Sequence, residues 1–151
     1  MKLMIASDIH GAAGYCRDLL SAFDWEGAAR LLLLGDILYH GPRNDLPKEY
    51  APKEVIAQLS PLKEKILCVR GNCDAYSRSD AEENLLFNAD GVRIFMTHGH
   101  RYNVKLGYES LANAAHFSGA QLALFGHTHI PHEEYDLSLI HISEPTRLLS
   151  I

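Results

Sequence analysis

The sequence predicts an α/β fold in which several strands run parallel. It contains five short apolar runs of strand length, and segments whose apolar residues recur at helical spacing lie between them. Such alternation is typical of parallel sheets, whose strands are connected by helices. Because these sheets bind ligands at the carboxyl ends of their strands, the residues that follow each apolar run are the first candidates for function.

The first half of the chain contains two predicted strands and two predicted helices. Residues 2–7 (KLMIAS) are a short apolar run that predicts a buried strand, and the spacing of apolar residues in 14–24 predicts a helix. Residues 29–35 (ARLLLLG) predict a second buried strand. The Gly, Pro, Asn and Asp content of 40–47 indicates a loop, and 53–59 is a short helix that stops near a proline.

The second half of the chain contains three predicted strands and one predicted helix. Residues 65–70 (KILCVR) predict the third strand, and the following segment, 74–84, is polar and turn-like. Residues 92–97 (VRIFMT) predict the fourth strand. A helix over 108–119, ending near a glycine, leads to the fifth strand at 121–126 (QLALFG).

Composition indicates one globular domain in a reducing compartment. The chain has 151 residues, of which 47% are hydrophobic and 22% charged, and no apolar run is long enough to span a membrane. The first apolar run reaches Asp8 too soon for a secretory signal, and the three cysteines form no disulfide framework. We therefore expect a cytoplasmic protein. The net charge of −5 predicts neither a membrane nor a stable nucleic-acid partner.

All five predicted strands end in residues that bind metals or phosphate. A polar turn explains one such strand end, but it does not explain five at the same end of the strands. Carboxylates and imidazoles together suit Mn, Fe or Zn, and the lack of a thiolate pair argues against a structural zinc site. The residues are Asp8, His10, Asp36, His40, Arg70, Asn72, Cys73, Asp74, His98, His100, His127 and His129.

These motifs resemble the pattern of the calcineurin-like metallophosphoesterases. DIH, GD, GNCD, HGH and GHTH follow one another in the family's order between residues 8 and 129. The cysteine in GNCD and the loop HGPRN at 40–44 look most like the small YfcE-type bacterial phosphodiesterases. The resemblance runs over residues 1–136, and it implies a sandwich of two mixed β-sheets flanked by helices.

The resemblance also implies a reaction and its metals. The chain would be a dinuclear metal-dependent phosphodiesterase, in which a metal-bridging hydroxide attacks a small-molecule phosphodiester. Two divalent ions are expected, with Mn first and Ni, Fe, Zn or Mg as alternatives. The first ion would be held by Asp8, His10, Asp36 and His129, and the second by Asp36, Asn72, His98 and His127.

The catalytic set implied by the resemblance lacks one member of the family pattern. It comprises Asp36, Asn72, His98, His100 and Asp74. The family's common general-acid histidine is replaced by Cys73, and a thiol is a poor proton donor for an alkoxide. Either His100, His40 or a metal-bound water protonates the leaving group, or the substrates need little protonation. Asp74 either orients a neighbour or caps a turn.

Four residues are candidates for substrate binding, namely Arg43, Asn44, Arg70 and His40. Arg43 and Asn44 follow the second strand and could hold a non-bridging phosphate oxygen. Arg70 could do the same or could pair with a carboxylate.

The end of the chain departs from the family. We expect a metallophosphoesterase domain over 1–136 that is incomplete at its C-terminus, followed by a non-native tail over 137–151. This tail should be exposed and should not pair into a sheet. Two alternatives to an enzyme are a non-catalytic, metal-binding interaction scaffold of the same fold and a single-metal storage or sensing protein. Self-association into a homo-oligomer stays open.

Overall fold

The computed structural model describes residues 1–74, 81–136, 139–143 and 146–150, and it contains two sheets and three longer helices within those ranges. The elements are β1 (Lys2–Ala6), α1 (Ala13–Glu26), β2 (Arg30–Leu33), α2 (Pro52–Leu59), η1 (Ser60–Lys65), β3 (Ile66–Cys68), β4 (Asn84–Ala89), β5 (Val92–Thr97), η3 (His100–Tyr102), α3 (Glu109–Phe117), β6 (Leu122–Phe125), β7 (His132–Asp136), β8 (Leu139–Ser143) and β9 (Thr146–Ser150). All eight predicted elements are present, with ends within two residues of the prediction.

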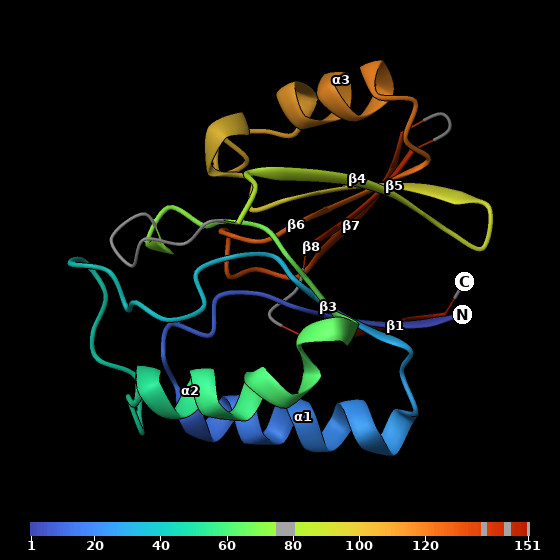
Figure 1. The fold of residues 1–151 in the computed structure, drawn as a ribbon. Coiled ribbons are helices and arrows are strands. Elements are labelled where there is room, and N and C mark those ends of the chain that lie inside the picture. Colours follow the sequence, from blue (N-terminus) through green and yellow to red (C-terminus); the bar gives the residue numbers. More distant parts are fainter. Residues whose placement is uncertain (75–80, 137–138, 144–145, 151) are drawn as a thin grey trace.

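The two sheets pack face to face, and the expected sandwich with helices outside it is confirmed (Figure 1). One sheet has the strand order β3-β2-β1-β9 and the other has the order β4-β5-β6-β8-β7. Both sheets are mixed, since β1 pairs parallel to β2 but antiparallel to β9, and β5 pairs parallel to β6 but antiparallel to β4. The predicted parallel pairs therefore exist in each sheet.

Alternate residues of the central strands fill different layers of the core. Leu3 and Ile5 of β1 belong to the apolar cluster between the sheets, together with residues of β5 and β6. Met4 and Ala6 belong to the cluster that includes Phe23 of α1. Because side chains alternate across a strand, a run that is apolar at every position is buried on both faces, as predicted.

The helices cover the outer faces of the sandwich. Helices α1 and α2 lie against the first sheet and α3 lies against the second (Figure 1). Helix α1 ends at Gly27, which takes the left-handed conformation that commonly terminates a helix. In the part of the chain that the structure describes, every helix is too short or too polar to cross a bilayer.

The sequence prediction missed strand β4. The segment 74–84 was expected to be polar and turn-like, but its last residue, Asn84, begins a strand that pairs antiparallel with β5; residues 75–80 lie outside the described part. Ala89 and Val92 are paired across a two-residue turn, and Asp90 and Gly91 have φ of 48° and 90°. An Asp-Gly pair between two apolar runs is a strong signal for such a hairpin, and it could have found this strand.

The prediction that residues 137–151 stay outside the sheets is wrong for the residues described. Strand β8 lies between β6 and β7, and Ile140 is the register partner of Leu122. Strand β9 pairs antiparallel with β1, and Arg147 is the partner of Ile5. Both segments contain residues that favour strands, and without them β6 and β1 would present unpaired edges. Both sheets therefore include strands that follow the predicted domain boundary at residue 136. A non-native origin of residues 137–151 stays a prediction.

Candidate metal centre

The metal-ligand candidates lie on turns that follow β1, β2, β3, β5 and β6. Five of them have a positive φ of between 50° and 71°, which is uncommon for residues other than glycine. Backbone strain of this kind clusters at functional sites, where the surrounding fold holds it in place. The five residues are Asp8, His10, Asp36, His127 and His129.

Asp8, His10 and His129 form the first ligand group. Their ligand atoms all lie within 4.8 Å of one another. Asp8 Oδ1 is 3.1 Å from His129 Nε2 and 3.6 Å from His10 Nε2. Asp8 Oδ1 and His10 Nε2 are buried, and neither has a hydrogen-bond partner among the described residues. Buried polar atoms without a partner are costly, so their convergence fits a bound cation.

Asp36, His98 and His127 form the second group, within the same 4.8 Å limit. His98 is fully buried, and its Nε2 lies 3.4 Å from Asp36 Oδ2 and 3.1 Å from Asn72 Oδ1. Asp36 Oδ2 also lies 3.9 Å from His10 Nε2 of the first group. The Asp36 carboxylate therefore stands between the two groups, as a bridging ligand must.

Backbone carbonyls fix the orientation of two of the imidazole rings. The Nδ1 of His10 lies 2.9 Å from the carbonyl oxygen of Tyr39, and the Nδ1 of His98 lies 2.7 Å from that of Leu34. Because a carbonyl only accepts, each Nδ1 must donate its proton. Each Nε2 then faces the centre and is free to bind a metal once it is deprotonated, which is the usual outer support of a metal-binding histidine.

Both carboxylates of the centre are charged at neutral pH. Burial raises the pKa of Asp8, but contacts with His10 and His129 outweigh burial and hold the pKa well below its usual range. Burial also raises the pKa of Asp36, and the neighbouring His98 more than reverses this effect. Negative charge is thus retained in a buried site, which favours protonated histidines or a bound cation beside it.

The imidazoles of the centre differ in pKa, and therefore in whether a proton must leave before a cation binds. Burial, followed by the charges of His98 and Lys105, lowers the pKa of His127 to about 4, so this ring is neutral at pH 7. For His10 and His98 burial lowers the pKa, but the neighbouring carboxylates raise it above its ordinary value. A metal ion would therefore displace protons from these two rings, and its affinity should fall as the pH falls.

Two glycines allow the turns to approach one another. A Cβ on Gly71 would lie 2.0 Å from Asp36 Oδ1, and a Cβ on Gly126 would lie 1.9 Å from Ser7 Oγ. Either side chain would push apart the segments that carry the ligands. The Gly-Asn and Gly-His pairs of the sequence motifs are thus steric requirements of this centre.

Asp74 stabilises the turns that carry the ligands, and it is not among the residues that line the cavity at the centre. Its carboxylate accepts hydrogen bonds from the backbone N–H groups of Asp36 (2.7 Å), Ile37 (3.0 Å) and Gly71 (2.9 Å). These bonds join the turn after β2 to the turn after β3. Of the two roles considered from the sequence, this geometry supports orientation of a neighbour, so we assign Asp74 as a positioning residue for Asp36.

Replacing Asp74 with Asn should lower the free energy of unfolding by about 2–3 kcal/mol. The amide keeps one oxygen but turns an NH₂ group toward buried N–H donors, which leaves donors unsatisfied. Urea unfolding of the metal-free protein would measure the loss. The matched control is the exposed Asp24 on α1, where the same change should stay within about 0.5 kcal/mol. Equal stability of both variants would refute the role of Asp74.

A cavity of about 380 Å³ opens onto the ligand groups. It is lined by five of the predicted ligands, by the 41–44 loop, by Cys73 and by Lys105. Arg43 and Asn44 line it, as expected for substrate-binding residues. Lys105 was missed by the sequence reasoning, because no motif surrounds it.

Arg70, His40 and His100 are not among the lining residues of this cavity. Arg70 donates to Glu83 (2.7 Å), which is the carboxylate pairing considered as its alternative role. The His40 ring lies edge-on to Tyr39 and Tyr50, and its carbonyl accepts a hydrogen bond from Asn44. The His100 ring centre lies 5.4 Å from that of His98, and burial, followed by the charge of His98, lowers its pKa.

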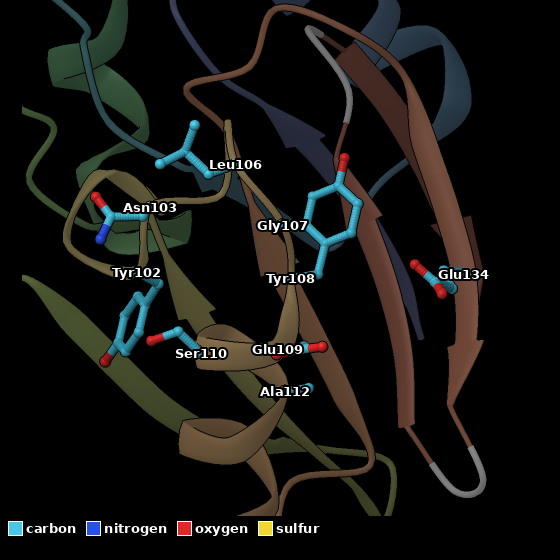
Figure 2. Close-up of a pocket in the computed structure, with 9 residues that line it drawn as sticks. All are labelled: Tyr102, Asn103, Leu106, Gly107, Tyr108, Glu109, Ser110, Ala112 and Glu134. Atoms are coloured by element: carbon cyan, nitrogen blue, oxygen red, sulfur yellow. The ribbon is translucent and has the colours of Figure 1, made fainter.

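A larger cavity, of about 510 Å³, lies elsewhere (Figure 2). It is lined by residues of the 102–112 segment and by Glu134 of β7, and it contains none of the predicted site residues. By size alone the larger cavity would be the candidate functional site, but the convergent ligand residues indicate the smaller cavity instead.

Comparison with known proteins shows which family has this fold. The chain belongs to the calcineurin-like phosphoesterase superfamily, whose domain it matches over residues 1–144. The family resemblance inferred from the motifs is thus confirmed.

Individual members of the family and solved structures are similar to this chain. Phosphodiesterase YfcE of Escherichia coli (strain K12) is 36% identical over 95% of this chain and 77% of its own. The structure of the E. coli phosphoesterase YfcE has a TM-score of 0.79 at 33% identity, and the match covers 97% of this chain and 81% of that one. Vps29 of Entamoeba histolytica, solved with Zn²⁺, has a TM-score of 0.73 at 17% identity and covers 100% of this chain and 86% of its own; at that identity it shows the fold alone.

Proposed function

We propose that the chain is a dinuclear metal-dependent phosphodiesterase acting on small-molecule phosphodiesters. The observation that carries the proposal is the position of Asp36 between two groups of ligand atoms, two of which are buried and have no hydrogen-bond partner among the described residues. Similarity to a named phosphodiesterase supports the type of bond that is hydrolysed.

The residues present fit two divalent cations. Asp8, His10 and His129 would hold one ion, His98, His127 and Asn72 would hold the other, and Asp36 would contact both. When bound, such a pair supplies Lewis acidity that activates water near neutral pH and neutralises charge on phosphoryl oxygens. The imidazole content favours Mn, with Ni, Fe, Zn and Mg as alternatives.

The protein's own side chains would bind and orient the substrate. Arg43 lines the cavity, and its planar guanidinium can donate two parallel hydrogen bonds to phosphate oxygens. Asn44 lies beside it and is held by the bond from its Nδ2 to the His40 carbonyl (2.7 Å). The turn that carries Asp36 is fixed by Asp74, so the bridging carboxylate needs little reorganisation on binding.

A non-catalytic scaffold of the same fold is the alternative. All seven ligand positions of the family pattern are filled here, and cationic side chains line the adjoining cavity. A protein used only for interaction would need neither feature. A single-metal storage or sensing protein would not need the bridging position of Asp36.

Three further expectations stay predictions. They are a cytoplasmic location, the lack of a stable nucleic-acid partner and the lack of a membrane partner, while self-association into a homo-oligomer stays open. The three cysteines, which suggested a reducing compartment, are all free thiols.

Removal of metal should abolish hydrolysis of an aryl phosphodiester such as bis(p-nitrophenyl) phosphate. Mn²⁺ added to the stripped protein should restore more activity than Mg²⁺, because imidazole-rich sites disfavour Mg²⁺. The measurement is the rate of p-nitrophenolate release after addition of Mn, Ni, Fe, Zn or Mg in turn. Full activity in excess chelator would overturn the proposed function.

A further inference from the structure

Two cationic side chains at the cavity have no carboxylate partner in the described residues. Arg43 and Lys105 both line the cavity, and neither takes part in an ion pair there. Arg70 and Arg101 differ in this respect, because both pair with Glu83. In a chain with a net charge of −5, unpaired cations beside a cavity indicate an anionic occupant.

The segment that carries Lys105 is anchored to the fold. Val104 is only 2% exposed and packs against Gly99, where a Cβ would lie 2.9 Å from a Val104 methyl group. Val104 and Lys105 are the central residues of a turn that is closed by the bond from the Leu106 N–H to the Asn103 carbonyl (2.8 Å). The buried valine therefore fixes the backbone next to Lys105.

The neighbours of Lys105 face a different cavity. Asn103 and Leu106 line the larger cavity shown in Figure 2, whereas Lys105 lines the one that contains the metal ligands. Of these three residues of the turn, Lys105 alone lines the cavity at the candidate centre. A lysine carries its charge on a long flexible stem, which suits an anionic group whose position varies between substrates.

We propose that Lys105 binds a second anionic group, a carboxylate or phosphate, on one arm of the phosphodiester substrate. The inference rests on the proposed function, because it concerns substrate binding at the same centre. The ligand groups and Arg43 already provide for the scissile phosphate. A cavity of about 380 Å³ lies in the size range of sites for whole small molecules, so it has room for an arm beyond the phosphate. The substrate class is then a diester with at least two separate negative charges.

Two phosphinates that differ only at one end provide the test. In a phosphinate both ester oxygens are replaced by carbon, so the compound cannot be hydrolysed. One compound has an arm that ends in a carboxylate, and the other has the matching carboxamide. Calorimetric titration of the Mn²⁺-loaded protein gives a Kd for each. The carboxylate should bind about two- to fivefold more tightly, as expected for one partly exposed charge pair.

Variants locate the source of this preference. Lys105→Ala should bind the two phosphinates equally, whereas Lys105→Arg should keep the preference because it keeps the charge. Lys53→Ala is the matched control, since Lys53 is exposed on α2 away from the cavity lining, and it should behave as wild type. A preference that survives in Lys105→Ala, or no preference in wild type, would overturn the inference.

The proposed function is judged separately by turnover. If wild type shows the preference but does not hydrolyse the aryl diester with any metal, the phosphodiesterase proposal fails, and with it the claim that the arm bound by Lys105 belongs to a substrate. If wild type hydrolyses the diester and the preference is absent, only the role of Lys105 fails.

Discussion

Replacing Asp36 with Ala should remove both metal ions and reduce aryl diester hydrolysis by about 10²–10³-fold or more. The Asp36 carboxylate lies 3.4 Å from His98 Nε2 and 3.9 Å from His10 Nε2, so it is shared by both ligand groups. Its loss takes a negative charge from each ion and separates the groups. Calorimetric titration with Mn²⁺ and the steady-state rate would measure the two effects.

His129 provides the contrast, because it belongs to one ligand group and its side chain is half exposed. His129→Ala should weaken one ion, and high metal concentration should restore part of the lost rate. Asp36→Ala should not recover in this way. Circular dichroism should show that both variants fold. Two tightly bound metals per chain in Asp36→Ala would contradict the bridging assignment.

The candidate metal-binding residues could be predicted because they follow apolar runs, whereas their division between two ions came from the family resemblance and stays a prediction. A strand that is buried on both faces has to end where polar residues begin, and parallel strands in one sheet end at the same edge. The sequence pattern does not show the backbone conformation that orients these side chains. Asp8 and His10 both have a positive φ, a conformation that Asp and His adopt more often than most residues but still too rarely to be predicted from the motif.

The features that sequence reasoning missed depend on contacts between distant segments. Lys105 reaches the cavity because the neighbouring Val104 is buried against Gly99. Arg70 donates a hydrogen bond to Glu83, which lies thirteen residues further along the chain, and it does not line the cavity. Residues 139–143 and 146–150 pair along the edges that β6 and β1 would otherwise leave open, which a reading of local pattern does not reveal. Strand β4 had a clear local signal, the turn at Asp90 and Gly91.

Cys73 is where the chain departs most from the wider family pattern, which has a histidine after Gly-Asn. The thiol is 4% exposed and lines the cavity beside the ligands. Burial, followed by the nearby Asp36, raises its pKa to about 12. A general acid works best when its pKa is near the operating pH, so this thiol would donate a proton poorly. The rate should therefore depend on how well the leaving group departs without protonation.

The hydrolysis rate should fall steeply as the pKa of the leaving group rises, and aryl diesters should far exceed alkyl diesters of matched size. Cys73→His should flatten this dependence, because the imidazole can extend into the adjoining cavity and protonate the leaving oxygen. The gain on alkyl diesters should approach the roughly 10²–10⁴-fold that general acid catalysis contributes, with little gain on aryl diesters. Cys73→Ser is the control and should leave the slope unchanged. The measurement is log rate against leaving-group pKa for the three proteins. A shallow wild-type slope that steepens in Cys73→Ser would show instead that the thiol itself transfers the proton.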